Sequence, residues 1–257
     1  MSTLYGCEYH FESGITFALY AVCYDTDEGA YSMAIKLTFH GQSCFQLDDG
    51  THTVLIDPFF TDNPVTKTEA ENVTCSHIAI THGHFDHFAD CESIAKANDA
   101  TVYAAYEICD YLGEQGHKKC EPGNPGGRIE APFGGVSFTQ AFHSSSFKGR
   151  YMGMPCGLII EFAGAVLYHA GDTALFSDME LLGQIYSPDV VMLPIGDRFT
   201  MGPEMAAVAA EMIGAPTAIP MHYNTWPAIE VDVKRFAPKD IDVLVMEPGD
   251  ALELSAE

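Results

Sequence analysis

The residues with the clearest chemical potential lie in a six-residue stretch, 82–87, whose sequence is HGHFDH and which directly follows an apolar segment. His82 and His84 can face the same side of an extended backbone, while Asp86 and His87 leave the stretch in a different direction. Imidazole nitrogens and carboxylate oxygens are common ligands of divalent metals. The spacing therefore predicts a metal site whose donors diverge enough to serve two cations. The alternative interpretation is a group of unrelated surface histidines.

A metal ion needs more ligands than one loop supplies, and three further candidates lie farther along the chain. His143, Asp172 and His222 each follow an apolar segment with the character of a β-strand. Because strand ends bring side chains to the edge of a sheet, we expect these three to lie near residues 82–87. Taken one at a time, each has the alternative interpretation of a capping residue or a hydrogen-bonded core residue.

These motifs together resemble the metallo-β-lactamase superfamily, and the resemblance extends from about residue 33 to the C-terminal region. The segments KLTFHGQSCF, LIDPFFTDNP, GDRFTMGPEMAA and PMHYNTWP resemble a group of small, uncharacterised metal-dependent hydrolases related to ascorbate-6-phosphate lactonase-like proteins. The resemblance implies two metal positions joined by one aspartate. Carried over to this chain, the first metal is held by His82, His84 and His143, the second by Asp86, His87 and His222, and Asp172 bridges them.

Such a site is suited to hydrolysis. Two divalent cations, expected to be Zn, with Mn, Fe, Co or Ni as alternatives, would bind a water or hydroxide and lower the pKa of that water toward about 7. Asp86 is the predicted catalytic residue, which orients this nucleophile or takes its proton. The expected substrate is a small ester, lactone, thioester or phosphodiester.

Residues around the predicted ligands have supporting roles with open alternatives. Metal-bound histidines usually donate their second N–H to a carboxylate. Asp57 is the candidate for this role, with the alternative of a turn former before proline, and the resemblance favours the first. Tyr223 and Asn224 are candidates for substrate contacts, with a turn stabilised by the asparagine side chain as the alternative. Gln42 stands where the related group often has histidine, which puts in doubt any polar contact carried by that position.

The elements that must position these residues alternate between strands and helices, which predicts an α/β fold. Strands are expected at residues 36–40, 53–57, 76–81, 101–104, 136–142, 158–162, 166–169, 190–194, 217–221 and 243–246. Helices are expected at about 86–97, 106–115, 175–186 and 203–213, and a Gly- and Pro-rich loop at 121–127 separates two halves. The pattern predicts a four-layer αββα sandwich with two pseudo-symmetric halves.

Composition limits the partners. The 257-residue chain carries 36 acidic and 12 basic side chains, a net charge of −24. Polyanion binding depends on Lys and Arg, so nucleic acid and anionic membranes are disfavoured and a small-molecule substrate is expected, with a homo-oligomer as an option. The eight cysteines are scattered without a C-x-x-C pair, which indicates free thiols and a cytoplasmic location.

The first 32 residues carry five acids and no bases. We expect a dispensable extension, either disordered or a wrongly assigned start, followed by a metallo-β-lactamase-like domain over residues 33–257.

Two other functions share this kind of metal site. One is a nuclease or phosphodiesterase acting on nucleic acid, but the span from His87 to His143 is too short for an inserted domain and the nearby basic residues are few. The other is a non-catalytic or redox metal-binding protein. A redox role would usually need a flavin domain or partner, and the sequence offers no nucleotide-binding G-x-G-x-x-G loop, whereas a non-catalytic metal-binding scaffold stays an alternative. A metal-dependent hydrolase is therefore the favoured prediction.

Overall fold

The computed structural model describes residues 5–10, 16–21 and 35–254, and the chain divides into two compact units, Met1–Ser32 and Met33–Glu257. In the first unit, β1 (Tyr5–His10) and β2 (Thr16–Ala21) pair antiparallel. The expectation of a disordered or wrongly started extension falls largely outside the described residues and stays a prediction.

The first sheet of the second unit has seven strands, with an antiparallel part followed by a parallel part. Strands β3, β4 and β5 pair antiparallel, and β5 to β8 pair parallel. Its order is β18 (Ala251–Leu254), β3 (Ile35–Gly41), β4 (Cys44–Asp48), β5 (Thr53–Ile56), β6 (His77–Ala79), β7 (Thr101–Ala105) and β8 (Cys120–Gly123).

The second sheet also has seven strands and repeats this plan. Strands β9, β10, β13 and β14 pair antiparallel, and β14 to β17 pair parallel. Its order is β17 (Asp242–Val243), β16 (Thr217–Met221), β15 (Val190–Pro194), β14 (Ala165–His169), β13 (Cys156–Phe162), β10 (Gly134–Gln140) and β9 (Arg128–Ala131). The shared plan matches the expected pseudo-symmetry of the two halves.

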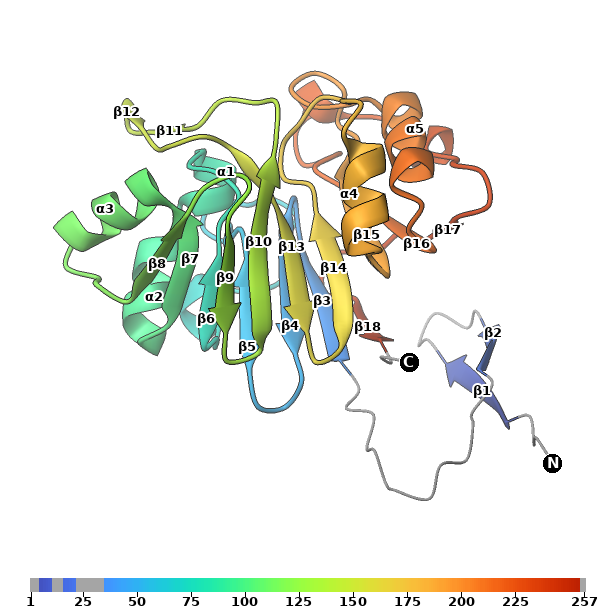
Figure 1. Cartoon of the computed structure of the whole chain (residues 1–257), viewed down its shortest axis with the longest axis horizontal. Helices are drawn as coiled ribbons and strands as arrows, with labels where there is room; N and C mark the ends of the chain where they lie inside the picture. Colours follow the sequence, from blue (N-terminus) through green and yellow to red (C-terminus); the bar gives the residue numbers. More distant parts are fainter. Residues whose placement is uncertain (1–4, 11–15, 22–34, 255–257) are drawn as a thin grey trace. The chain divides into compact units, whose positions relative to one another are not determined.

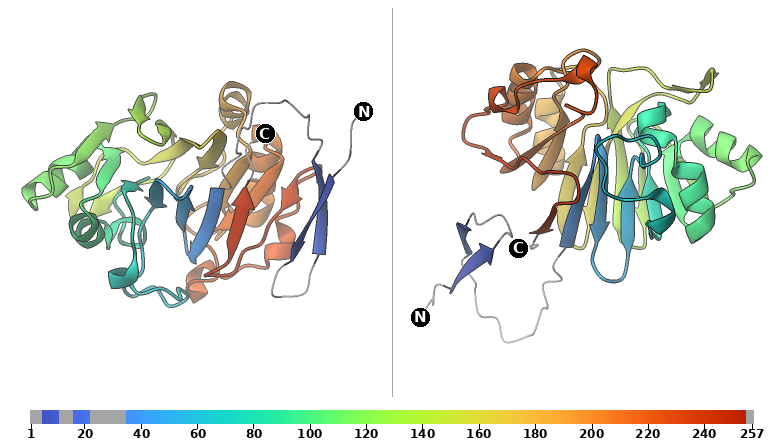
Figure 2. Two further views of the ribbon diagram at one scale, coloured as in Figure 1. Left: turned by 90° about the horizontal axis from the view of Figure 1, so that it is seen from below. Right: turned by 180° about the vertical axis from the view of Figure 1, so that it is seen from behind.

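The two sheets pack face to face through one apolar core, in which Leu37, Phe45 and Ile56 from the first sheet meet residues such as Leu158 and Leu167 from the second. Helices cover the outer faces over separate apolar clusters. These helices are α2 (Cys91–Asn98) and α3 (Tyr106–Glu114) on the first sheet, and α4 (Met179–Tyr186) and α5 (Pro203–Ile213) on the second. Figures 1 and 2 show the resulting layers, which confirm the four-layer αββα sandwich.

Short elements complete the described chain. The helix α1 (Phe85–Phe88) follows β6, and the hairpin of β11 (Ser146–Phe147) and β12 (Arg150–Tyr151) follows β10. Three 3-10 turns span Ala70–Asn72, Pro227–Ile229 and Val233–Arg235. No helix in the described ranges is long and apolar enough to cross a membrane.

Several expected elements differ in extent. The helix expected at 86–97 is split into α1 and α2, because the buried Asp90 carboxylate accepts hydrogen bonds from the Phe60 and Thr61 N–H groups at 2.7 and 2.9 Å and anchors the break. The loop expected at 121–127 instead begins as strand β8, which contains Pro122. Proline is tolerated there because β8 is an edge strand, where a missing N–H leaves no gap inside the sheet.

The structure also differs from expectation in where some elements begin or end, and it contains strands that have no clear pattern in the sequence. The helix expected from residue 175 starts at Met179, and the strand expected at 243–246 ends at Val243. Strands β4, β9 and β18 were not expected, because short strands on the surface or beside a turn lack a long apolar run.

The strands that precede the predicted ligands run in the same direction within their sheets. In the first sheet β5 and β6 are parallel, and in the second β10 and β14 run alike because each is antiparallel to β13. Their C-terminal ends therefore lie at one edge of each sheet, and the loops that leave these ends carry the candidate site.

Candidate metal centre

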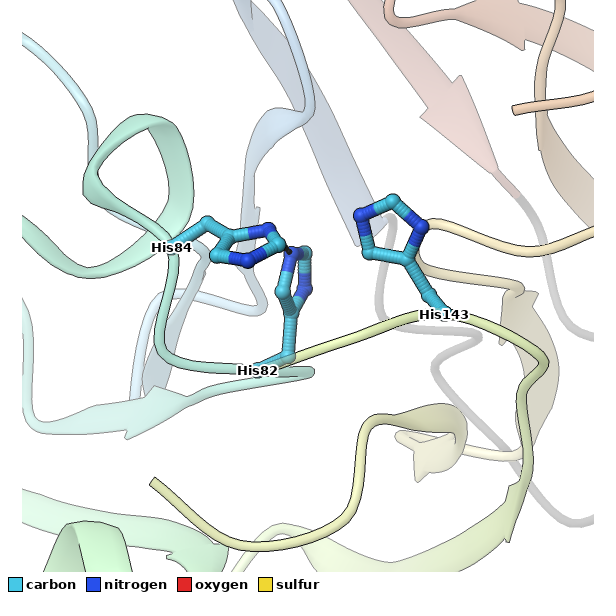
Figure 3. A group of neighbouring side chains, drawn as sticks. All are labelled: His82, His84 and His143. Atoms are coloured by element: carbon cyan, nitrogen blue, oxygen red, sulfur yellow. Dashed lines mark hydrogen bonds between the residues drawn. The ribbon is translucent and has the colours of Figure 1, made fainter. Parts of the chain in front are cut away.

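Three histidines form the first group of potential ligands. His82 and His84 leave the end of β6, and His143 follows β10. His82 Nε2 lies 3.0 Å from His84 Nδ1, and the His143 ring centroid lies 5.2 and 5.0 Å from those of His82 and His84. Figure 3 shows the three rings turned toward a common space, and one nitrogen from each can meet within 4.8 Å.

The second group consists of Asp86, His87 and His222. The first two lie in the single turn of α1, and His222 directly follows β16 and adopts a φ of 56°. His222 Nε2 and His87 Nε2 lie 3.3 and 3.6 Å from Asp86 Oδ2. These three side chains are likewise close enough to share one ion.

Asp172 lies between the two groups. Its Oδ2 is 3.4 Å from His143 Nε2, 4.0 Å from His82 Nε2 and 3.0 Å from His222 Nε2. Its Oδ1 is 3.4 Å from His87 Nε2. One carboxylate thus faces histidines of both groups, which is the geometry needed to join two ions.

The charges of the site also fit cations. Asp172 and Asp86 are only 3% and 8% exposed, and within the described residues no Lys or Arg forms an ion pair with either. Buried carboxylates without a counter-charge are strongly unfavourable. His87 Nε2 and Asp172 Oδ1, which face each other, are buried and have no hydrogen-bond partner among the residues described. Both observations indicate a site built for positive charge.

Protonation of the site follows the same pattern. Burial lowers the pKa of His82, His84 and His143, which keeps these rings neutral, as metal ligands must be. Burial alone would also lower the pKa of His222, but Asp172 and Asp86 outweigh it and raise the pKa to about 9. Without a metal, protons therefore supply the positive charge that the two carboxylates attract.

Asp57 lies behind His87 at the end of β5. Its Oδ2 accepts a hydrogen bond from His87 Nδ1 at 2.7 Å and another from Thr81 Oγ1 at 2.6 Å, while its Oδ1 accepts one from Thr81 N at 2.8 Å. The carboxylate is fully buried, and the residue adopts a φ of 46°. The Nδ1 proton is thus held on Asp57, which leaves His87 Nε2 free to face Asp172.

Gln42 makes contacts that sequence reasoning did not find. Its side-chain amide donates to Asp86 Oδ2 at 2.9 Å, its side-chain oxygen accepts from Thr225 Oγ1, and its backbone carbonyl accepts from His222 N at 2.7 Å. Gln42 therefore links two residues of the second group. The doubt about a polar contact at this position was wrong, because glutamine supplies both a donor and an acceptor there.

The loop that carries His82 and His84 lies against three residues that the sequence did not single out, Ser144, Ser145 and Met152. Gly83 N donates to Ser145 Oγ at 3.1 Å. A Cβ atom on Gly83 would lie 2.4 Å from Met152 Cβ, so only glycine fits between the two histidines. Ser144 Oγ also lies 3.3 Å from His84 Nε2. Serine after a histidine carries no distinctive sequence signal.

The two residues predicted to contact substrate, Tyr223 and Asn224, have structural contacts of their own. Asn224 Oδ1 accepts a hydrogen bond from Val231 N at 2.8 Å, which is the turn role considered as the alternative. Tyr223 packs against the apolar cluster on the outer face of the second sheet. Their contact with substrate stays a prediction. His169 is buried, and its Nε2 lies 2.9 Å from the Ser43 carbonyl oxygen.

The fold is that of the metallo-β-lactamase superfamily. Residues 52–223 match the family model described as a beta-lactamase superfamily domain. The metallo-beta-lactamase fold protein YhfI from Bacillus subtilis superposes with a TM-score of 0.66 at 15% identity, covering 86% of this chain and 99% of that one, which is a likeness of fold alone.

More similar proteins narrow the family. A UPF0173 metal-dependent hydrolase from Geobacillus thermodenitrificans is 46% identical over 228 residues, covering 86% of this chain and all of the relative. The metallo hydrolase Igni18 from the archaeon Ignicoccus hospitalis is 36% identical, with a TM-score of 0.79 and coverage of 86% and 99%. The chain belongs to the UPF0173 family of metal-dependent hydrolases.

The predicted superfamily and the predicted class of enzyme, a metal-dependent hydrolase, are thereby confirmed. The expected relation to ascorbate-6-phosphate lactonase-like proteins stays a prediction.

Proposed function

We propose that this hydrolase binds two divalent cations, with Zn the expected metal, and acts on a small ester, lactone, thioester or phosphodiester. The first cation would be held by the three-histidine group and the second by Asp86, His87 and His222, with Asp172 shared. The observation that carries the proposal is the position of Asp172, whose two oxygens face histidines of both groups at 3.0 to 4.0 Å.

The cations, when bound, would lower the pKa of a bound water and polarise a carbonyl or phosphoryl oxygen of the substrate. The chain itself holds the ligands in place. Asp57 fixes the Nδ1 proton of His87, and Gln42 holds the Asp86 carboxylate through its side-chain amide. Positioning of this kind keeps donor atoms aimed at one point and lowers the reorganisation needed during reaction.

Asp86 is the proposed catalytic carboxylate, which orients the attacking water or takes its proton. Among the carboxylates of the site it is the most accessible, with 8% exposure against 3% for Asp172 and none for Asp57. Burial alone would raise the pKa of Asp86, but His87 and His222 outweigh that effect and keep the group ionised. An ionised carboxylate beside the site can accept a proton.

A small substrate is favoured over nucleic acid. The net charge of −24 opposes a polyanion, whose binding requires many Lys and Arg contacts. Five of the twelve basic side chains also form ion pairs with acids in the described region, among them Arg150, which pairs with Asp110 and Glu114. We further propose a cytoplasmic location, supported by the six cysteines between residues 35 and 254, which are free thiols, five of them buried.

The test combines elemental analysis with a screen of chromogenic phosphodiesters, lactones, thioesters and esters. We expect two metal ions per chain and turnover in at least one class. His84→Ala should lower metal content and activity together, whereas Asp86→Asn, assayed at full metal occupancy, should lower turnover by about 10²-fold or more. Unchanged turnover of Asp86→Asn would remove its catalytic role, and two bound metals without any hydrolysis would favour a non-catalytic metal protein.

A further inference from the structure

Two phenylalanines next to the metal ligands are exposed to solvent. Phe85 stands between His84 and Asp86 in the sequence and is 56% exposed, and Phe142 directly precedes His143 and is 60% exposed. Exposed apolar residues scattered singly are ordinary on protein surfaces. These two are distinguished by their position, because each is one residue from a ligand.

Phe85 belongs to a built aromatic group. Its ring lies perpendicular to that of the buried Phe59, with centroids 5.8 Å apart, and 5.9 Å from the ring of Trp226. The Phe59 and Trp226 centroids are also 5.9 Å apart, so the three rings contact one another pairwise. Trp226 is half-buried and lies four residues after His222. This Phe59–Phe85–Trp226 group therefore joins the loop of the first ligands to the loop of the last one.

Phe142 is fixed by a second set of contacts. Its N–H donates to Thr173 Oγ1 at 3.0 Å, and its carbonyl accepts from Ala174 N at 3.3 Å. Its ring lies 5.4 Å from that of Phe176. The backbone of Phe142 is thus tied to the loop that carries Asp172. The exposed ring is consequently held at a defined place beside the metal centre, and its exposure is a property of the fold.

We propose that Phe85, Trp226 and Phe142 form the binding site for an aryl or other flat apolar group of the substrate, next to the bond that is cleaved. This inference rests on the proposed function and names the substrate class: an aryl-bearing carboxylic or phosphoric ester, lactone or thioester. Ligand sites combine apolar and aromatic walls with few polar groups, and aromatic rings bind one another edge to face or offset. The polar groups here are those of the metal centre, and the exposed rings supply the apolar walls.

The test uses two probes that differ only in their apolar part, phenylphosphonate and methylphosphonate, titrated calorimetrically into the zinc-loaded protein. We expect phenylphosphonate to bind at least tenfold more tightly. Phe85→Ala and Phe142→Ala should each weaken phenylphosphonate binding by about five- to tenfold and leave methylphosphonate binding within twofold. Trp226 is the only tryptophan of the chain, so phenylphosphonate should also change the fluorescence of the wild-type protein.

Ile185→Ala is the matched control. Ile185 is 69% exposed and lies at the end of α4, which leads to the N-terminal end of β15 and so to the edge of the sheet opposite the metal centre. This variant should bind both probes like the wild type. Equal affinity of the wild type for the two probes, or a phenyl preference that survives both phenylalanine substitutions, would overturn the proposal.

A second probe separates this inference from the proposed function. Benzyl alcohol carries the ring without a charged group, and it should change the Trp226 emission of metal-free wild-type protein but not that of metal-free Phe142→Ala. If that response is present while zinc fails to improve methylphosphonate binding, the metal centre is refuted and the aromatic site stands. If zinc promotes phosphonate binding without a phenyl preference, only the aromatic site is refuted.

Discussion

Replacing Asp57 with Asn should move a proton on His87. The Asp57 carboxylate accepts from Thr81 N at 2.8 Å through one oxygen and from His87 Nδ1 at 2.7 Å through the other. Asparagine keeps the shape of the side chain but has only one oxygen. If that oxygen stays with Thr81 N–H, the asparagine NH₂ group faces His87 Nδ1, which must then accept a hydrogen bond. The ring proton is expected to move to Nε2.

The expected size of the effect follows from where Nε2 lies. It is 3.4 Å from Asp172 Oδ1 and 3.6 Å from Asp86 Oδ2, among the proposed ligands of the second cation. A protonated nitrogen cannot bind a metal ion. Loss of such a supporting carboxylate typically weakens metal binding by about 10- to 100-fold, or about 1.4 to 2.8 kcal/mol. The effect should be largest at the second cation, because Asp57 contacts His87 directly, whereas it reaches His82 only through Thr81 Oγ1, which lies 3.0 Å from His82 Nδ1.

The assay is competition for zinc against a chelator of known affinity, together with nitrogen NMR of the His87 ring in the zinc-loaded protein to identify the protonated atom. Asp90→Asn is the matched control. Asp90 is also buried and accepts hydrogen bonds from the Phe60 and Thr61 N–H groups, and none of its side-chain hydrogen bonds in the described region goes to a proposed ligand. Zinc affinity should stay within twofold in this control. Wild-type affinity in Asp57→Asn, with the proton still on Nδ1, would refute the reasoning.

Three further predictions concern stability. A chain of residues 33–257 should melt within about 3 °C of the full chain and keep its metal content, and failure to fold would show that residues 1–32 are required. Burial, with a smaller contribution from His52, lowers the pKa of His77 to about 4, so the unfolded chain binds a proton that the folded chain does not between pH 6.5 and 4. The free energy of unfolding should therefore fall by an amount on the order of 3 kcal/mol as pH falls through this window. Urea unfolding of the wild type and of His77→Gln at several pH values measures this loss. If the free energy of unfolding depends on pH equally in both proteins, the assignment to His77 is contradicted. Gly83→Ala should lower the free energy of unfolding by about 1 to 3 kcal/mol, because the added methyl would lie 2.4 Å from Met152 Cβ, and an unchanged urea midpoint would show that the loop adapts.

The fold was predictable where the sequence pattern is local. Apolar runs marked the strands β7, β13 and β15, and a proline at the first turn marked the helix α5. The positions of these elements agree with expectation. The features that the sequence did not predict are those that depend on contacts between residues far apart in the chain. The break between α1 and α2 depends on Asp90, which binds backbone N–H groups about thirty residues earlier in the chain.

The candidate site divides in the same way. Residues 82–87 are neighbours in the chain, so their types and spacing already indicate a metal site. That His143, Asp172 and His222 reach the same place could be expected only from strand ends and from family resemblance. The distances of 3.0 to 4.0 Å between Asp172 Oδ2 and the Nε2 atoms of His82, His143 and His222 result from the packing of the two sheets.

The sequence alone indicated the class of this protein, because the H-x-H-x-D-H motif lies within six consecutive residues. Only the tertiary structure decided which groups support the ligands. Gln42 contacts Asp86 across 44 positions and Thr225 across 183, and such contacts leave no periodic or local signal. The physical reason is that a hydrogen bond depends on position in space, which the chain sets only when both sheets have closed around their shared core.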